Sequence, residues 1–314
     1  MKLSLIVPCY NEEDNVYSFY NAVKDTFNNC PFDYEIIFIN DGSHDDTFKN
    51  LKKIYKESLL NIKIINFSRN FGKESAIYAG LVKSVGDYVS IIDADLQQNP
   101  KFVLDMIDFL DSNDDYDCVA TFQEKRKEGK ALIFFKNSFY KIINKLTDLD
   151  FVNGASDFRT FRRSMAESLI SMSEYHRFSK GLFSWIGFNT HYMPYQASER
   201  YAGKSKWSFR KLCRYAVDGI VAFSTTPLRI SSIIGIFTAM LSVVYLIVVI
   251  IQKMFLSIAV PGYATIVVLI LLLGGLQLSA LGIIGEYLAK IYIQSKGRPI
   301  YIVKEVISYE DKKD

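Results

Sequence analysis

Two long uncharged stretches near the C-terminus constrain the fold of this chain more than any other feature of its sequence. No residue from Ile230 to Gln252 is charged, and after Lys253 a second uncharged stretch runs from Met254 to Gly285. Each is longer than the roughly 20 residues that an α-helix needs to cross the hydrocarbon core of a bilayer. Pro261 and Gly262 suit a short turn outside the membrane. The sequence therefore predicts two transmembrane helices, because too few other residues remain to bury a helical hairpin of this length in a soluble core.

The basic residues around these stretches predict their orientation. They flank both outer sides, whereas Lys253 alone lies between the stretches; they are Arg210, Lys211, Arg214 and Arg229 before the first stretch and Lys290, Lys296 and Arg298 after the second. Cytoplasmic segments of membrane proteins carry the excess of Lys and Arg. We therefore expect a multi-pass protein of the cytoplasmic (inner) membrane with both termini in the cytoplasm.

Composition excludes several other classes of protein. The 314 residues include 37 Lys and Arg against 34 Asp and Glu, and a net charge of +3 is too small for a dedicated nucleic-acid-binding protein. The 4 cysteines are far apart and form no C-x-x-C pair, so we expect reduced thiols facing the cytosol rather than zinc ligands. The N-terminal segment MKLSLIVPCYNEE lacks the apolar run of a signal peptide.

The rest of the sequence alternates between short β-rich runs and mixed segments typical of helices. The runs expected to form strands are Leu3–Val7, Glu35–Asn40, Ile62–Phe67, Asp87–Ile92 and Cys118–Phe122. This alternation predicts an α/β fold with a doubly wound, mostly parallel sheet. Ligands of such sheets bind beyond the carboxyl ends of the strands, so the residues that follow each strand form the candidate site.

Polar motifs follow four of the predicted strands. They are PCYNE at 8–12, NDGS at 40–43, SRNFGK at 68–73 and DADLQ at 93–97. No G-x-G-x-x-G follows the first strand, and no G-x-x-x-x-G-K-[ST] occurs. Their absence argues against the dinucleotide-binding and P-loop modes of holding a nucleotide.

The acidic residues of the DADLQ motif suit a divalent cation. Asp93 and Asp95 place two carboxylates on the same side of an extended segment, and Gln97 continues the alternation. Mg²⁺ and Mn²⁺ bind to one or two such carboxylates and complete their shell with water and substrate phosphates. Taken alone, the pair also fits a helix cap with a solvated neighbour. Asp41 likewise fits a turn, because Asn-Asp-Gly-Ser is good turn chemistry.

The order of the motifs along the chain resembles a known family. The segments IVPCYNEE, NDGS, SRNFGK, DADLQ, GASDFRTFRR and RYAGKSKW resemble family 2 glycosyltransferases of the GT-A fold. With two C-terminal spans and the tail GEYLAKIYIQSKGRPIYIV, nearly the whole chain is similar to polyprenyl-phosphate glycosyltransferases, namely bactoprenol glucosyltransferases, aminoarabinose transferases and dolichyl-phosphate mannose synthases. The Q-x-x-R-W motif of processive members is absent, which disfavours polymerisation. The resemblance implies a GT-A type, Rossmann-like sheet followed by two transmembrane helices.

The resemblance also implies roles for the motif residues. Those implied to bind the nucleotide of a UDP-sugar are Pro8, Tyr10, Asn11, Glu12, Asp41, Lys73 and Asp93, with Asp41 recognising the base. Those implied to ligate Mg²⁺ or Mn²⁺ beside the diphosphate are Asp93, Asp95 and Gln97. By residue type alone, a strand-ending turn at 8–10 is the better interpretation, and 11–12 would cap a helix that starts near Glu13.

The expected acceptor, a polyprenyl phosphate, needs little activation. Its second pKa near 6 leaves it largely dianionic at neutral pH, so its oxygen can displace the diphosphate and invert the anomeric configuration. Asp157 matches the position of the family's candidate base and joins Asp95 as a candidate catalytic residue. We expect Asp157 mainly to position the acceptor and sugar or to stabilise positive charge, with proton abstraction second. The alternative for Asp157 is a helix N-cap or a partner for Arg159.

Basic and amphipathic segments are expected to lie near the acceptor. The residues implied to hold its phosphate are Arg126, Lys136, Arg200, Ser205 and Lys206. The expected division of the chain is a cytoplasmic catalytic domain at 1–207, with an interfacial or core helix at 131–149, an amphipathic juxtamembrane helix at 208–228, two spans within 229–286 and a cytoplasmic tail at 287–314.

These observations predict a metal-dependent, inverting glycosyltransferase that moves a hexose, with glucose as the first choice, from a UDP-sugar to undecaprenyl or another polyprenyl phosphate. The resemblance implies a homotetramer. An N-acetylhexosamine or aminoarabinose donor is the alternative within the class, and polyprenol length stays open. A nucleotide-sugar-binding scaffold without turnover is the alternative of another class, against which the intact Asp93, Asp95 and Asp157 argue. A transporter is disfavoured because neither span contains an ionisable residue.

Overall fold

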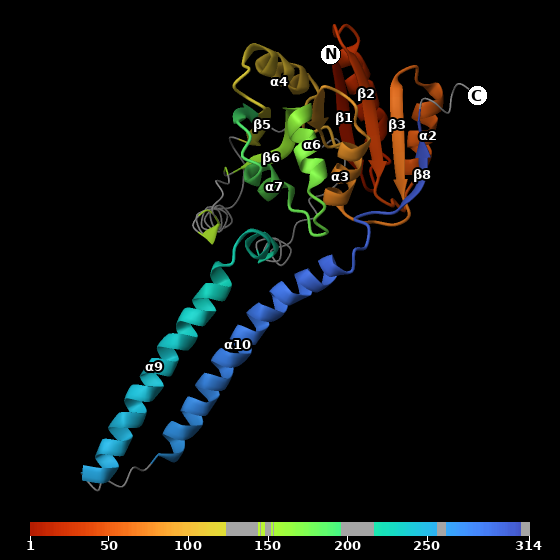
Figure 1. The fold of residues 1–314 in the computed structure, drawn as a ribbon. Coiled ribbons are helices and arrows are strands. Elements are labelled where there is room, and N and C mark those ends of the chain that lie inside the picture. The colour runs from red at the N-terminus through yellow and green to blue at the C-terminus, as the bar shows by residue number, and fades with distance from the viewer. Residues whose placement is uncertain are drawn as a thin grey trace.

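The centre of the fold is one eight-stranded sheet in the order β7-β5-β6-β4-β1-β2-β3-β8 (Figure 1). The computed structural model describes residues 1–123, 144, 146–147, 152, 154–195, 217–255 and 262–308. The strands are β1 (Lys2–Cys9), β2 (Asp33–Asn40), β3 (Asn61–Phe67), β4 (Tyr88–Ile91), β5 (Cys118–Gln123), β6 (Ala155–Arg162), β7 (Thr190–Tyr195) and β8 (Val303–Ile307). Strands β3, β2, β1 and β4 are parallel neighbours, whereas β6 runs antiparallel to β4 and β5.

Helices cover both faces of the sheet. One layer consists of α1 (Val16–Phe27), α2 (Thr47–Glu57) and α4 (Lys101–Ser112), and the other of α3 (Lys73–Lys83), α6 (Arg163–Ser171) and α7 (Ser179–Trp185). Along β1, Leu5 and Val7 pack into the first layer and Ile6 into the second. Because both faces are covered, the central strands are apolar without interruption, which explains why their sequences read as continuous β-rich runs.

The predicted fold class is confirmed. Each of the five expected strand runs forms a strand, and the mixed, mostly parallel sheet has the predicted GT-A type arrangement. The sequence did not predict β6, β7 or β8. β6 contains the SDFR segment, and its insertion between β4 and β5 depends on pairing with residues distant in the chain, such as Ile91 with Arg159.

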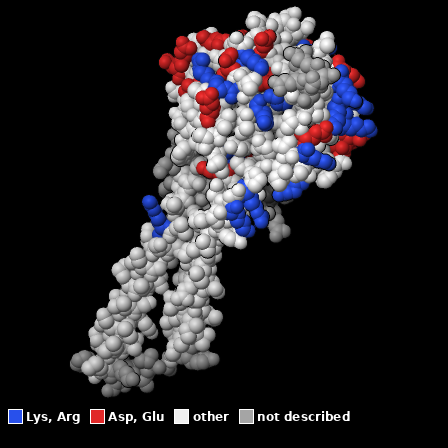
Figure 2. Space-filling model, turned by 45° about the vertical axis from the view of Figure 1, so that its right-hand side comes forward, with Lys and Arg blue, Asp and Glu red and all other residues white. Residues whose placement is uncertain are grey.

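Two long helices leave the sheet-containing domain side by side (Figure 1). They are α9 (Thr226–Phe255) and α10 (Tyr263–Ser295), and within the described residues both are long and apolar enough to cross a membrane. Their candidate spans have mean hydropathies of 2.8 and 2.5, with none of the most apolar window buried in the structure. On the face shown in Figure 2, both helices are largely white, and Lys and Arg lie toward the domain. They are therefore unlike core helices of a soluble protein.

The segment after α10 returns to the sheet. Its strand β8 pairs antiparallel with the edge strand β3, and Ser68 donates its N–H to the carbonyl oxygen of Ile302 at 3.0 Å. The ring of Tyr301 stacks on Phe67 with centroids 4.9 Å apart. The part of the predicted C-terminal tail that the structure describes thus contains the end of α10 and one strand of the eight-stranded sheet.

Hydrogen bonds join the domain-proximal ends of both long helices. The hydroxyl of Tyr287 on α10 donates to the carbonyl oxygen of Ser224 at 2.6 Å, just before α9. Lys290 Nζ lies 3.5 Å from a carboxylate oxygen of Asp218. Within the predicted juxtamembrane helix 208–228, residues 217–223 are helical and α9 begins at Thr226, whereas most of the predicted helix 131–149 lies outside the described residues.

Candidate active site

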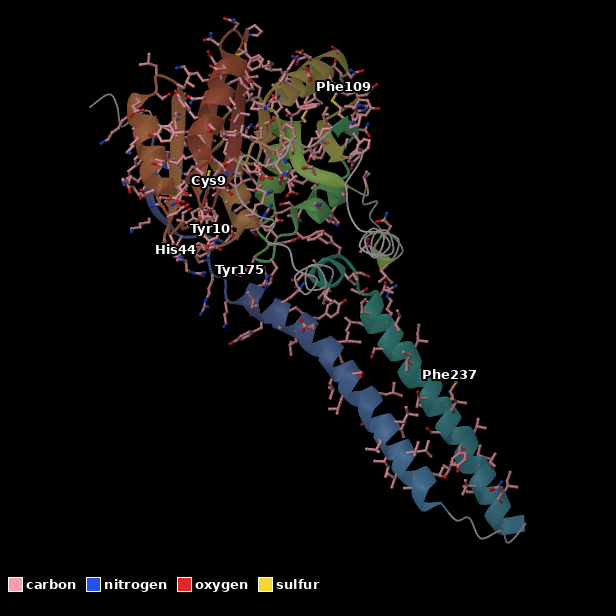
Figure 3. All side chains as sticks on the ribbon, turned by 180° about the vertical axis from the view of Figure 1, so that it is seen from behind. Cys9, Tyr10, His44, Phe109, Tyr175 and Phe237 are labelled. Atoms are coloured by element: carbon pink, nitrogen blue, oxygen red, sulfur yellow. The ribbon has the colours of Figure 1, made fainter. Side chains whose placement is uncertain are left out.

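The polar motifs meet at one edge of the sheet, as expected for parallel strands. The carboxyl ends of β1, β2, β3 and β4 lie together there, on the side of the domain from which α9 and α10 leave (Figure 1). Figure 3 shows Tyr10 and His44, from neighbouring loops, on this side of the domain. The candidate site therefore faces the two long helices.

The loops after β1 and β2 are joined by reciprocal hydrogen bonds around Asn11. The backbone N–H of Asn11 donates to Ser43 Oγ at 3.0 Å, and Asn11 Oδ1 accepts the N–H of His44 at 3.0 Å. Asn11 has a φ of 54°, which is uncommon for a residue other than glycine. The side chain therefore fixes a loop rather than capping α1, which begins at Val16.

Two other predicted nucleotide residues have defined places in these elements. Pro8 lies inside β1, opposite Ile39, so the strand continues past the turn suggested by its residue type. Glu12 donates its backbone N–H to Thr47 Oγ1 at 2.8 Å, and its carboxylate accepts Asn15 Nδ2 at 2.6 Å. The first contact joins this loop to the start of α2, and the second is internal to the loop.

Asp41 anchors the SRNFGK loop. Its carboxylate accepts the backbone N–H of Phe71 at 2.6 Å and that of Gly72 at 2.9 Å, and the residue is only 3% exposed. Burial raises the pKa of Asp41 against the lowering effect of these hydrogen bonds. Gly42, with φ +63°, lies so close to this loop that a Cβ would be 2.3 Å from the carbonyl carbon of Arg69. The loop that leads to Lys73 is thus held by backbone contacts.

Lys73 bridges two carboxylates, one in the turn after β4 and one in β6. Its ammonium lies 2.7 Å from Asp93 and 3.1 Å from Asp157, and the three side chains are 41%, 31% and 23% exposed. Burial favours the neutral lysine, but the two carboxylates outweigh it and raise the pKa of Lys73. Burial similarly opposes ionisation of Asp157, yet Lys73 above all lowers its pKa, so Asp157 is an anion at neutral pH. Asp157 lies in β6, which excludes the N-cap alternative, and its partner is Lys73 rather than Arg159.

The DADLQ motif forms a strained turn at the end of β4. Leu96 has a φ of 58°, and among the described residues it and Asn11 are the non-glycine residues with positive φ. Such strain concentrates at functional sites. The N–H of Gln97 donates to Asp95 Oδ1 at 3.2 Å. Since α4 begins at Lys101, whose N–H binds Asn99 Oδ1 at 2.9 Å, the acidic pair does not cap that helix.

The acidic pair has the donor chemistry of a partial cation site. Within the described part of the chain, no group of three or more His, Cys, Asp or Glu side chains could hold a metal ion. Asp95 is partly exposed at the sheet edge, and Asp93 is shared with Lys73. One or two carboxylates with a neighbouring amide fit Mg²⁺ or Mn²⁺ when substrate phosphates supply further oxygens. The residues present therefore fit a cation that binds together with a diphosphate.

Sequence reasoning missed Glu74, the residue after Lys73. Its carboxylate accepts the backbone N–H of Ser179 at 3.0 Å and also the hydroxyl of Ser179, which ties α3 to α7. Burial, and next the charge of Asp157, raise the pKa of Glu74 to about 7. Only its position directly after Lys73, the last residue of the SRNFGK motif, could have indicated this role. All the predicted acceptor-phosphate residues, Arg126, Lys136, Arg200, Ser205 and Lys206, lie outside the described residues.

A GT-A type sheet with an acidic D-x-D turn and a third carboxylate at its carboxyl edge defines a class, the nucleotide-sugar-dependent glycosyltransferases. Comparison with known sequences agrees. The family model described as glycosyl transferase family 2 matches residues 4–170. The chain belongs to this family.

Relatives match almost the entire chain. The CsbB protein of Bacillus subtilis is 43% identical over 304 residues, covering 96% of this chain and 91% of CsbB. The bactoprenol glucosyl transferase of Shigella phage SfV is 38% identical over 304 residues, covering 97% of this chain and 98% of the relative. Similarity thus includes the two long helices as well as the catalytic domain.

Solved structures resemble the catalytic domain in fold. Glucosyl-3-phosphoglycerate synthase from Mycobacterium tuberculosis, in complex with Mn²⁺, UDP and phosphoglyceric acid, has a TM-score of 0.50 at 18% identity. The match covers 70% of this chain and 76% of the synthase. At this identity the likeness concerns the fold.

Proposed function

We propose that this protein transfers glucose from UDP-glucose to a polyprenyl phosphate at the cytoplasmic face of the membrane, giving polyprenyl-phosphate glucose and UDP. One observation carries the proposal. Lys73 joins Asp93 of the D-x-D turn to Asp157 of β6, at the sheet edge that faces two apolar helices. A donor site and a candidate catalytic carboxylate therefore lie together on the side where a lipid acceptor would arrive.

The donor is assigned to the loops after β1, β2 and β3. The paired loops around Asn11 and the buried Asp41 supply a preformed, rigid wall for a nucleotide. In this assignment Pro8, Tyr10, Asn11 and Glu12 line the uridine pocket, with Asp41 and Lys73 beside it. Because both oxygens of Asp41 already hold backbone amides, its contribution to base recognition includes fixing the 68–73 loop.

A divalent cation is assigned to Asp93, Asp95 and Gln97. Bound there, Mg²⁺ or Mn²⁺ would neutralise the charge of the departing diphosphate. The donor chemistry of the acidic turn supports this assignment, and the M. tuberculosis synthase of similar fold was solved with Mn²⁺ and UDP. Lys73 adds a fixed positive charge next to Asp93.

The transfer step needs no strong base. An oxygen of the dianionic acceptor phosphate forms the new bond to the anomeric carbon as the bond to UDP breaks, and UDP leaves with the electron pair. Attack from the face opposite UDP inverts the anomeric configuration, with positive charge on the sugar in the transition state. Asp157, kept ionised by Lys73, can stabilise that charge and orient the acceptor.

The membrane topology follows the same proposal. The sheet contains strands from before α9 and a strand from after α10, so the spans leave and return on one side. Flanking Lys and Arg assign that side to the cytoplasm. Relatives named bactoprenol glucosyl transferases support a polyprenyl lipid as the acceptor and glucose as the transferred sugar. The proposal also includes three expectations from the sequence. They are a homotetramer, a helix at 131–149 that lies at the membrane interface, and contacts of the basic loops with the acceptor phosphate.

The test is an assay of the solubilised full chain with undecaprenyl phosphate, Mg²⁺ or Mn²⁺, and a panel of UDP-sugars, with the lipid fraction analysed by mass spectrometry. We expect a metal-dependent glucolipid that disappears in Asp95→Ala. A product from UDP-N-acetylhexosamine or an aminoarabinose donor instead would change the donor within the class. Tight metal-dependent UDP binding without product from any donor would replace the enzyme by a nucleotide-sugar-binding scaffold.

A further inference from the structure

Arg159 lies beyond Asp157 on β6 and has an unsatisfied donor. Alternation along the strand places Asp157 and Arg159 on the same face of the sheet. Arg159 is 4% exposed, donates one N–H to the carbonyl oxygen of Ser156 at 2.9 Å and lies 3.7 Å from the ring centroid of Phe183. Its Nε is buried without a hydrogen-bond partner. A buried charged donor left unpaired is costly, so the site favours an acceptor atom.

Lys180 on α7 supplies a second cation. Its ammonium has no hydrogen bond or ion pair with any side chain in the described ranges, although its charge helps lower the pKa of Asp157. Two other basic side chains close to this edge of the sheet already have partners. Lys73 binds two carboxylates, and Arg69, in the loop after β3, donates to the carbonyl oxygen of Asn70 and lies over the ring of Phe71. Within the part of the chain that the structure describes, Lys180 is thus a basic group near Asp157 without a side-chain partner.

Arg159 and Lys180 line the same small cavity. Its volume is about 20 Å³, and the hydroxyl-bearing residues Ser184, Thr190 and Tyr192 complete its polar wall. A cavity of roughly 10–15 Å³ accommodates one water-sized atom. The cavity can therefore take one oxygen of an anionic group, with the rest of the group at its mouth.

The position of α7 connects this cavity to the membrane side of the protein. The ring of Phe178 lies 6.0 Å from that of Phe223, which lies three residues before the start of α9. Gly181 packs so tightly against Phe223 that a Cβ would lie 2.2 Å from the ring. The cavity wall is thus in contact with the segment that leads into the first apolar helix, whereas the donor residues lie on the other side of Asp157, toward β4 and β1.

We propose that Arg159 and Lys180 bind the phosphate group of the lipid acceptor and present it beside Asp157. The inference rests on the proposed function and adds two binding residues to it. A dianionic phosphate that approaches the anion Asp157 needs positive charge on its other side. The pair of cations supplies that charge from the membrane-proximal direction, and the guanidinium Nε gains the acceptor it lacks.

Lys180→Gln in the full-length, solubilised protein tests the inference, with Lys180→Arg as the conservative variant and the exposed Lys56→Gln on α2 as the matched control. Transfer is measured against varied undecaprenyl phosphate and varied UDP-glucose, and UDP binding is measured by calorimetry. We expect Lys180→Gln to raise the acceptor KM about tenfold and leave the Kd for UDP unchanged, because one charge-assisted hydrogen bond is lost. Lys180→Arg should restore most of the affinity, and Lys56→Gln should behave as wild type.

Inorganic phosphate and a short-chain prenyl phosphate, used as competitors, identify the source of the phosphate. Competition against the lipid acceptor by both compounds, weakened about tenfold in Lys180→Gln, supports a phosphate site, and a stronger effect of the prenyl compound assigns it to the lipid. The inference is overturned if Lys180→Gln leaves the acceptor KM unchanged, or if it raises only the KM for UDP-glucose. In either case, transfer by the wild type still supports the proposed function. If the wild type itself forms no glycolipid, the proposed function fails. The phosphate site is then tested separately, and it is overturned if Lys180→Gln binds phosphate as tightly as the wild type.

Discussion

The ammonium of Lys73 lies 3.1 Å from a carboxylate oxygen of Asp157. This contact joins the first residue of α3 to a strand that the chain reaches much later, and it keeps the candidate catalytic carboxylate ionised. The same ammonium lies 2.7 Å from Asp93, so the D-x-D turn and β6 share one cation.

Replacement of Lys73 should change the pH dependence of transfer. Lys73 lowers the pKa of Asp157, whereas burial raises it. In Lys73→Gln the lowering effect of Lys73 is lost, so the pKa of Asp157 rises and the carboxylate becomes protonated at a higher pH than in the wild type. The acid limb of the profile of kcat/KM against pH should therefore move to higher pH, and the rate at pH 7 should fall about a hundredfold. Lys83→Gln, at the other end of α3, is the control. An acid limb that stays in place would contradict a role for ionised Asp157.

Glu74 should make stability depend on pH. Its pKa of about 7 exceeds the ordinary value of 4.5, so the folded protein holds a proton that the unfolded chain releases. Stability from this group therefore falls as pH rises from about 4.5 to 7 and is constant above. Glu74→Gln, whose amide oxygen can still accept from Ser179, should be more stable than the wild type at pH 8, by about 1–2 kcal/mol of unfolding free energy. At pH 4, where Glu74 is protonated in the folded protein and largely protonated in the unfolded chain, the two should have similar stability. Thermal unfolding at both pH values, with the exposed Glu57→Gln as control, measures this difference. Equal melting at pH 8 would show that Glu74 is ionised without cost.

Two glycines separate steric packing from backbone strain in the 68–73 loop. Gly42 and Gly72 both have positive φ, but a Cβ at Gly42 would meet the Arg69 backbone at 2.3 Å, whereas a Cβ at Gly72 has nothing within 4 Å. Gly72→Ala should cost about 1–3 kcal/mol from strain alone. Gly42→Ala should cost more and, by displacing the loop, weaken UDP binding about tenfold. Thermal unfolding measures the loss of stability in each variant, and calorimetry measures the loss of UDP affinity. If both losses are the same in Gly42→Ala and Gly72→Ala, the close contact of Gly42 with Arg69 is not needed.

The returning strand β8 should stabilise the catalytic domain through apolar contact more than through charge. Tyr301 stacks on Phe67, and Tyr301→Ala should cost about 2 kcal/mol. The ion pair between Lys52 and Glu305 joins side chains that are 39% and 41% exposed, and Glu305→Gln should cost less than about 1 kcal/mol. Chemical denaturation of both variants measures the two losses in unfolding free energy. A larger loss in Glu305→Gln than in Tyr301→Ala would contradict the prediction.

Much of the fold was predictable because its signals are local. The strand runs are apolar without interruption since helices cover both faces of the sheet, and the length of the uncharged stretches predicts helices such as α9. For the site, the parallel strands explain why the motif residues Asp41, Lys73 and Asp93 meet at one edge.

The sequence by itself determined the class of fold, the two apolar helices and the carboxylates of the candidate site, because periodicity, length and short motifs are properties of neighbouring residues. Only the tertiary structure decided that β6 lies antiparallel between β4 and β5, that β8 forms the edge of the sheet beside β3, and that Lys73 pairs with Asp157. It also decided that Arg159 and Lys180 share a cavity. These contacts join segments far apart in the chain, and no local pattern specifies which distant partner a strand or a charge will find.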